Sequence, residues 1–176
     1  MIDWLVLLMF IALCEVVGAV SSVFTIKAIP YWYKNLKKPK FNPPGWVFGP
    51  AWTLLYGLMG LSLYLAFENA PNQAGILPGV IAFTLQLALN YFWTYIFFGR
   101  KNIKAALYEI IFLWIAIAAT IIFFFPISPL AAYLLLPYIA WVSFAALLNQ
   151  KIYELNITKE KKNSKKKSKK KAEKSK

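Results

Sequence analysis

Residues Trp32 to Gly60 read WYKNLKKPKFNPPGWVFGPAWTLLYGLMG, and this stretch decides how the rest of the chain is interpreted. Its first half, up to Pro44, is a basic loop whose prolines fix φ and drive the preceding residues out of the helical region. Its second half, from Trp46, begins an apolar helix rich in aromatic side chains. Such a stiff loop beside a helix end can wall a flat apolar pocket, or can simply anchor a membrane protein at the lipid–water interface.

The composition excludes most soluble proteins and most enzymes. At 176 residues one domain is expected, and 60% hydrophobic and 18% aromatic residues exceed what a soluble domain of this size can bury. The chain has no histidine and one cysteine, Cys14, so it lacks the commonest general base and the commonest metal ligand. No Ser/His/Asp set, phosphate-binding loop or cysteine cluster occurs. We therefore predict a membrane protein without a metal site.

The hydropathy pattern predicts an all-α membrane protein, a bundle of five transmembrane helices. Each apolar span is long enough to cross roughly 30 Å of hydrocarbon as a helix, and none alternates as a barrel strand does. The first span is not read as a signal peptide, because no basic residue precedes it. The spans are about Trp4 to Ile26, Trp46 to Phe67, Leu77 to Phe98, Ala105 to Phe125 and Leu130 to Tyr153, the last containing Pro137.

The basic residues predict the orientation. Five lysines lie in or beside the loop between the first two spans, and Arg100, Lys101 and Lys104 lie between the third and fourth. The two loops on the opposite side contain no lysine or arginine. Positive residues favour the cytoplasmic side, so we expect the N-terminus outside and the C-terminus in the cytoplasm.

The C-terminal tail carries most of the charge. Residues 157–176 contribute nine of the thirteen net positive charges, and Lys161 to Lys171 includes no apolar residue. We therefore expect two regions: a transmembrane domain over residues 1–156, and a disordered lysine-rich tail over residues 157–176. Beside a membrane the tail would lie on anionic lipid, at about 1 kcal/mol per basic residue. Neither an aromatic pattern nor a fold supports a nucleic-acid partner.

Polar residues inside the spans are candidate functional groups. Glu15 is ionisable at mid-depth, so it should face protein or water, either as a functional group or as a structural carboxyl. Gln86 and Asn90 lie inside the third span. Amides in such positions usually form hydrogen bonds to a neighbouring helix, and the alternative is that they bind a ligand.

Aromatic residues at helical spacing form stripes on three spans. Such stripes are usually core contacts, but flat Trp and Tyr faces also suit a flat ligand. The stripes are Trp52, Tyr56 and Met59 on the second span, Asn90 and Trp93 on the third, and Tyr138, Trp141 and Ala145 on the fifth.

The order of residues in the opening stretch resembles the TspO/MBR family of tryptophan-rich sensory proteins and translocator proteins. The matching residues are Trp32-Tyr33, Lys38-Pro39, Pro43-Pro44, Trp46, Pro50, Trp52, Leu55-Tyr56 and Met59-Gly60, and Pro137-Tyr138 with Trp141 matches on the fifth span. The resemblance implies a ligand pocket toward the cytoplasmic end, beneath the first loop. Carried over motif by motif, its residues are Ser22, Trp32, Tyr33, Pro43, Trp52, Tyr56, Asn90, Trp93, Trp141 and Ala145.

The resemblance also implies a function. It implies a multi-pass protein of the cell membrane that binds porphyrins such as protoporphyrin IX as ligand, with no further cofactor required. For microbial members it implies light-dependent porphyrin breakdown involving Trp52 and Trp141. A transporter of small amphipathic molecules such as porphyrins or sterols is the alternative. A homodimer is also implied, with Gly79, Ala82 and Ala88 on the third span as a candidate contact.

Overall fold

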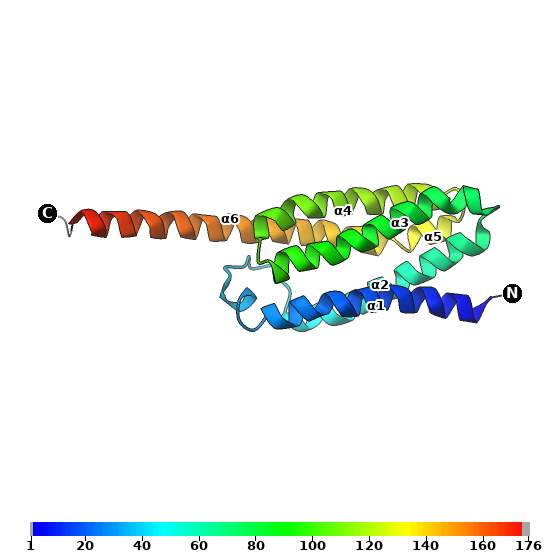
Figure 1. Ribbon diagram of the computed structural model, residues 1–176, viewed down its shortest axis with the longest axis horizontal. Coiled ribbons are helices and arrows are strands. Elements are labelled where there is room, and N and C mark those ends of the chain that lie inside the picture. Colours follow the sequence, from blue (N-terminus) through cyan, green and yellow to red (C-terminus); the bar gives the residue numbers. More distant parts are fainter. Residues whose placement is uncertain (1, 174–176) are drawn as a thin grey trace.

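The structure, a computed structural model, describes residues 2–173, with the backbone alone from residue 158 onward. This part of the chain is helical and contains no strand (Figure 1). The helices are α1 (Trp4–Ala28), α2 (Gly45–Asn69), α3 (Gln73–Thr94), α4 (Ile103–Phe124), α5 (Pro129–Tyr133) and α6 (Leu136–Glu173). Two shorter elements are the 3₁₀ turn η1 (Tyr33–Asn35) and the π-helical turn η2 (Tyr95–Gly99), which continues α3.

Five spans within the described residues are long and apolar enough to cross a membrane, as predicted. α1, α2, α3 with η2, and α4 each form one span, and α5 together with the first part of α6 forms the fifth. Large apolar side chains cover the outside of the bundle, among them Leu8, Leu54, Ile81 and Ile122. Water would disfavour so much exposed apolar surface, whereas the hydrocarbon of a bilayer accommodates it. The chain is an integral membrane protein.

Short polar side chains cap the N-termini of four of the helices. The Asp3 carboxylate accepts hydrogen bonds from the backbone N–H groups of Leu5 and Val6 at the start of α1. Asn72, Asn102 and Ser128 play the same role for α3, α4 and α5. These caps satisfy N–H groups that have no partner inside the helix. They place the helix starts within a few residues of the predicted span boundaries.

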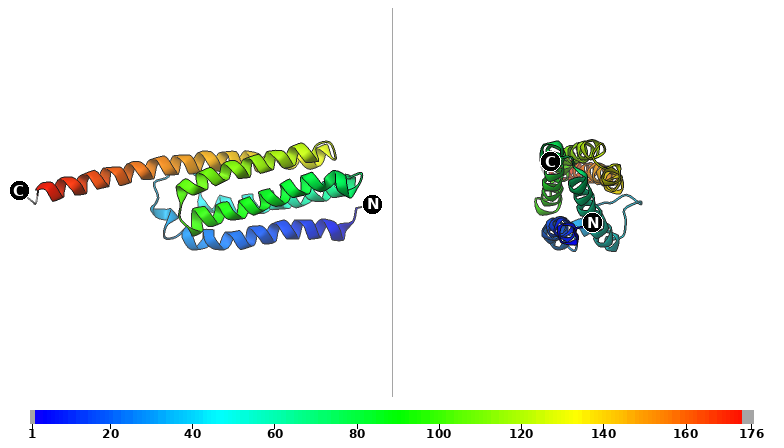
Figure 2. Two further views of the ribbon diagram at one scale, coloured as in Figure 1. Left: turned by 45° about the horizontal axis from the view of Figure 1, so that its top comes forward. Right: turned by 90° about the vertical axis from the view of Figure 1, so that its right-hand side faces the viewer.

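The helices form two groups. α1 packs along α2, while α3 packs along α4 and α4 packs along α6 (Figure 2). Gly60 permits the close approach of α1 and α2, since a Cβ atom at this position would lie 2.5 Å from Ile11 Cα. Contacts between α2 and α6 are few by comparison. The α1–α2 pair therefore diverges from α3 and α6 over part of its length.

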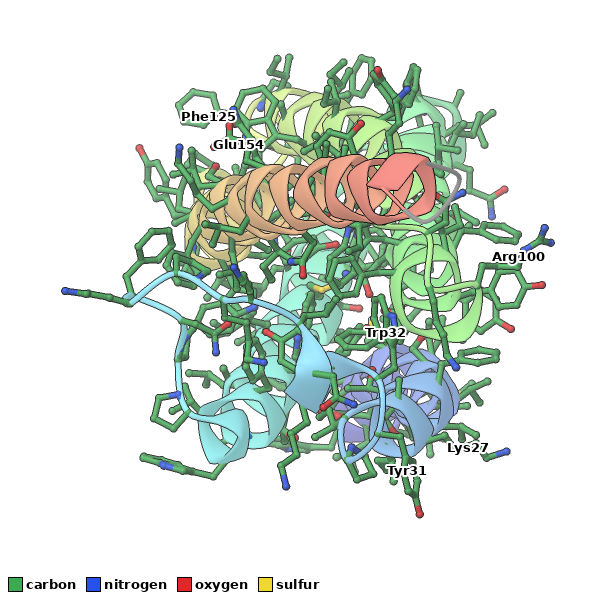
Figure 3. The ribbon with its side chains drawn as sticks, turned by 90° about the vertical axis from the view of Figure 1, so that its left-hand side faces the viewer. Lys27, Tyr31, Trp32, Arg100, Phe125 and Glu154 are labelled. Atoms are coloured by element: carbon green, nitrogen blue, oxygen red, sulfur yellow. The ribbon has the colours of Figure 1, made fainter. Side chains whose placement is uncertain are left out.

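The two termini lie at opposite ends of the bundle, as an odd number of spans requires (Figure 1). The loop between α1 and α2 lies at the same end as the link between η2 and α4. In the view onto this end, Lys27, Tyr31 and Arg100 point outward, whereas Trp32 lies toward the middle (Figure 3). The basic residues thus gather at one end. Which side of a membrane this end faces stays a prediction.

The fifth span differs from the single helix that hydropathy predicts. α5 ends at Tyr133, and α6 begins at Leu136. Pro137 is therefore the second residue of a new helix, where its missing N–H would have had no intrahelical partner. Because the residues on both sides of the break are apolar, a hydropathy profile does not reveal it.

The tail continues the last helix. α6 extends as one helix to Glu173 and projects beyond the bundle (Figure 1), and the disorder expected for residues 157–176 stays a prediction. Lysine is a good helix former, the tail has no glycine or proline, and extending an existing helix requires no new nucleus. The expected contact with anionic lipid falls on side chains outside the described residues.

Two of the three small residues proposed for a dimer contact are internal. Gly79 and Ala82 are both buried, and Gly79 lies against the ring of Phe124 on α4. Their small size therefore serves the contact between α3 and α4 within one chain. Ala88 is exposed, and the homodimer itself stays a prediction.

Candidate ligand-binding site

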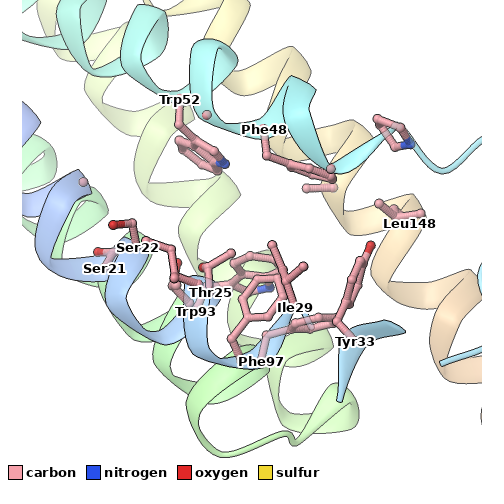
Figure 4. Close-up of a pocket in the computed structure, with 18 of the residues that line it drawn as sticks. Ser21, Ser22, Thr25, Ile29, Tyr33, Phe48, Trp52, Trp93, Phe97 and Leu148 are labelled. Carbon is pink, nitrogen blue, oxygen red and sulfur yellow. The ribbon is translucent and has the colours of Figure 1, made fainter. Parts of the chain in front are cut away.

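A cavity of about 990 Å³ opens where the α1–α2 pair diverges from α3 and α6. Ser21, Ser22 and Thr25 on α1 face Trp52 and Phe48 on α2 across it (Figure 4). Residues 29–44, which connect α1 to α2, contribute several side chains at one end. The volume is at the upper end of the range for small-molecule sites, roughly 300–1,000 Å³.

Aromatic rings form much of the cavity wall. On α2, the rings of Trp52 and Tyr56 lie 5.5 Å apart, centroid to centroid. On α3 and η2, the Trp93 and Phe97 rings stack at 5.1 Å with an interplanar angle of 20°. The π-helical turn places Phe97 one turn after Trp93, and such turns are frequent at functional sites. On α6, Trp141 contributes a ring to the same cavity. Flat apolar faces therefore come from three helices.

A buried polar network fixes Tyr56, which is part of this wall, and Tyr138, which lies behind it. The Tyr56 hydroxyl donates to Asn90 Oδ1 at 2.6 Å, and Asn90 Nδ2 donates to the Tyr138 hydroxyl at 3.0 Å. Asn90 thus joins α2, α3 and α6 by hydrogen bonds, as expected for an amide inside a span. Gln86, one turn earlier on α3, is also buried, but neither of its amide atoms has a partner within the described residues.

The loop over the cavity mouth is held by its own side chains. The buried Tyr33 hydroxyl donates to Asn42 Oδ1 at 2.7 Å and so joins the two halves of the loop. Burial raises the pKa of Tyr33 to about 12, although the hydrogen bond with Asn42 acts in the opposite direction. The hydroxyl therefore stays protonated and remains a donor at neutral pH.

Lys38 is a structural residue of this loop. Its ammonium donates to the backbone carbonyls of Tyr33, Lys34 and Leu36 and lies 4.7 Å from the centroid of the Tyr33 ring. Burial lowers the pKa of Lys38, while the three acceptors favour its charged form. Because its three N–H donors are occupied, Lys38 holds the loop closed and is not free to bind a ligand.

Asn156 ties the loop to α6. Its Oδ1 accepts from the backbone N–H of Lys37 at 3.1 Å, and its Nδ2 donates to the Lys37 carbonyl at 3.0 Å. This pair of hydrogen bonds imitates one rung of a β-ladder. It connects segments 119 residues apart in the sequence, across the end of the bundle.

Eight of the ten predicted pocket residues line the cavity. They are Ser22, Tyr33, Pro43, Trp52, Tyr56, Trp93, Trp141 and Ala145. The other two lie behind its wall. Asn90 is the hydrogen-bonding centre described above, and the Trp32 ring packs against Phe97 and Phe98 at 5.5 and 6.5 Å. Both act on the cavity through neighbours that line it.

Several further residues line the cavity, and the sequence carries a signal for each of them. Phe97 follows Trp93 by four positions, and Leu148 and Ile152 continue the helical face that begins at Trp141 and Ala145. Phe48 lies one turn before Trp52 on α2. Extending each stripe by one or two helical turns would have found them.

Fold and cavity together define a class: a five-span integral membrane protein with an aromatic cavity beneath its first loop. The sequence model of the TspO/MBR family matches residues 10–154, which is most of the chain. The chain belongs to the TspO/MBR family.

Curated relatives cover most of the chain. The chain is 45% identical to the tryptophan-rich protein TspO of Archaeoglobus fulgidus over 141 residues, which is 80% of this chain and 90% of that protein. It is 38% identical to the tryptophan-rich sensory protein of Cereibacter sphaeroides over 155 residues, 88% of this chain and 93% of that one. It is 40% identical to the human translocator protein over 127 residues, 71% and 75% of the two chains.

Proposed function

We propose that this protein binds a flat tetrapyrrole, such as protoporphyrin IX, in the aromatic cavity, and that it does so in the cell membrane without a further cofactor. The single observation that carries the proposal is the cavity itself. Rings from α2, α3 and α6 surround about 990 Å³ under a loop that is held at several points. An extended planar macrocycle stacks favourably on such faces.

Membership of the family supports the same proposal. Relatives of this chain carry the names tryptophan-rich sensory protein and translocator protein. The tryptophans of this chain that line the cavity are Trp52, Trp93 and Trp141. A cavity with three indole rings is well suited to an aromatic ligand, because each ring contributes a large apolar face at little conformational cost.

Translocation of small amphipathic molecules is the second candidate, in line with the name of the human relative. The form of the cavity favours binding over passage. On α2 the lining ends at Tyr56, and the next turn of that helix buries Met59 and Gly60 in the core of the bundle. A ligand that enters at the loop end would therefore leave by the same end unless the helices rearrange.

We further propose that the bound porphyrin is broken down in a light-dependent reaction. Trp52 and Trp141 both line the cavity, from α2 and α6. A ligand between these helices would touch both indole rings, as photochemistry on a tryptophan requires. The proposed roles of Trp52 and Trp141 are therefore stacking on the ligand and participation in its photochemical reaction.

The experiment follows porphyrin absorbance under illumination with the wild type and two variants, Trp52→Phe and Trp141→Phe, all saturated with protoporphyrin IX. Phenylalanine keeps an apolar ring, so binding should weaken by about 1 kcal/mol, the scale of an aromatic pair. Bleaching should fall much further. Trp46→Phe is the matched control, since Trp46 is 76% exposed and does not line the cavity. Equal bleaching in all four proteins would refute the photochemical role and leave a binding protein.

A further inference from the structure

Glu15 is an intramembrane carboxyl group that the tetrapyrrole proposal does not use. It lies near the middle of α1 and lines the cavity. Its Oε1 reaches α2 and lies 3.9 Å from the position that a Cβ atom on Gly57 would occupy. A charged or polar group at this depth costs a few kcal/mol on insertion scales unless it finds a partner. Because Glu15 lines the cavity, a partner for its carboxylate can approach from the cavity.

No positive side chain within the described residues compensates Glu15. The one ion pair there is Lys151 with Glu154, on α6. Two lysines line the cavity, Lys34 and Lys38, both in the loop. Ile29, just after the end of α1, is already about 21 Å along the helix from Glu15 at 1.5 Å per residue, and Lys38 is occupied by three carbonyls. The carboxylate therefore faces the cavity without a counter-ion from the described chain.

Aromatic rings lie within about one helical turn of this carboxylate along α1. The Tyr56 ring packs against Gly18, which is one turn after Glu15 on the same face of α1. Trp52 lies beside Tyr56, with ring centroids 5.5 Å apart. A carboxylate close to the faces of Trp and Tyr is the combination that recognises organic cations. The charge neutralises the cation, and the ring quadrupoles attract it.

We propose that the cavity has a second class of ligand, lipophilic aromatic cations, with Glu15 as their counter-ion. The cationic centre would lie against the Glu15 carboxylate, and the apolar body would lie among the rings of the cavity wall. The proposal does not rest on tetrapyrrole binding. Because both ligands use one cavity, the cation should compete with protoporphyrin IX wherever that binds.

The test compares two probes of similar shape, methyltriphenylphosphonium, which is cationic, and triphenylphosphine oxide, which is neutral. Binding is measured by tryptophan fluorescence with the full-length protein in an uncharged detergent. The wild type should bind the phosphonium about tenfold more tightly than the oxide, within the range of a partly desolvated cation–π contact. Equal affinities for the two probes in the wild type would overturn the proposal without any variant.

Two variants and a control assign the preference to Glu15. Glu15→Gln keeps size and polarity but removes the charge, so most of the preference for the phosphonium should be lost and only the part that the rings supply should remain. The affinity for the oxide should stay at about the wild-type value. Glu15→Asp keeps the charge and should retain part of the preference. Glu68→Gln removes an exposed carboxylate at the end of α2 and should change nothing. An unchanged preference in Glu15→Gln would overturn the proposal. Retained oxide binding in that variant shows that its cavity is intact.

Discussion

Replacing Asn90 by leucine tests the buried network that supports the cavity wall. The side chains of Tyr56, Asn90 and Tyr138 are 4%, 2% and 0% exposed, so none can turn to water when its partner is lost. Leucine has the same number and branching of side-chain heavy atoms as asparagine, so the substitution leaves no cavity, although its methyl groups are bulkier than the amide. Its effect should therefore come from the two hydrogen bonds, 2.6 Å from Tyr56 and 3.0 Å to Tyr138.

The magnitude follows from the two groups left without a partner. A buried polar group that loses a hydrogen-bond partner costs about 1–3 kcal/mol, so Asn90→Leu should destabilise the folded protein by about 2–6 kcal/mol. Asn90→Asp offers two acceptor oxygens, toward which both tyrosine hydroxyls can donate, and it should recover part of this loss. Freed from Asn90, the Tyr56 ring should also stack less well on a ligand.

The assay is thermal unfolding in detergent, followed by the near-ultraviolet signal of the aromatic residues, together with a protoporphyrin IX titration. Thr84→Val is the matched control on α3, because the Thr84 hydroxyl bonds only to the Val80 carbonyl of its own helix on the exposed side. Asn90→Leu should unfold at a clearly lower temperature than this control. A loss below about 1 kcal/mol, or an equal loss in Asn90→Asp, would refute the assigned role of the network.

Three further predictions concern the loop and the contact between α1 and α2. Asn156→Ala removes both hydrogen bonds to Lys37, so stopped-flow association and dissociation rates of the ligand should each rise roughly fivefold, with little change in Kd. Gln150→Ala on the same helix should change neither rate. Because the pKa of Tyr33 in the folded protein lies above its ordinary value of 10, its contribution to loop closure should be complete below pH 10 and lost as pH rises through about 12. Dissociation should then accelerate in the wild type but not in Tyr33→Phe. Gly60→Ala should destabilise the protein by about 1–3 kcal/mol, since its Cβ would lie 2.5 Å from Ile11 Cα. Gly57→Ala, whose nearest neighbour is 3.9 Å away, should be tolerated; equal melting temperatures for the two variants would contradict this reading.

Much of this fold was predictable because a bilayer restricts what a chain can do. Apolar length predicts the spans, and helical spacing predicts that Trp52 with Tyr56, and Trp141 with Ala145, share a face. The break between α5 and α6 was not predictable from hydropathy, because residues 134–136 are all leucine. Gln86 and Asn90 are both amides inside the third span, so the sequence does not tell which of them forms hydrogen bonds to neighbouring helices. Asn90 does so because Tyr56 and Tyr138 lie beside it. The loop between α1 and α2 has no regular spacing of apolar residues, so the contact of Trp32 with Phe97 could not be predicted from the sequence.

Blocking the cavity tests most directly whether the tetrapyrrole binds there. Ala145 lines the cavity on α6, whereas Ala140 on the same helix is exposed and does not. Ala145→Trp would fill part of the cavity with an indole ring, and Ala140→Trp adds the same ring outside it. In a fluorescence titration with protoporphyrin IX, the wild type and Ala140→Trp should show saturable one-to-one quenching, and Ala145→Trp should lose it. Saturable binding of equal affinity in all three proteins would place the ligand elsewhere on the molecule.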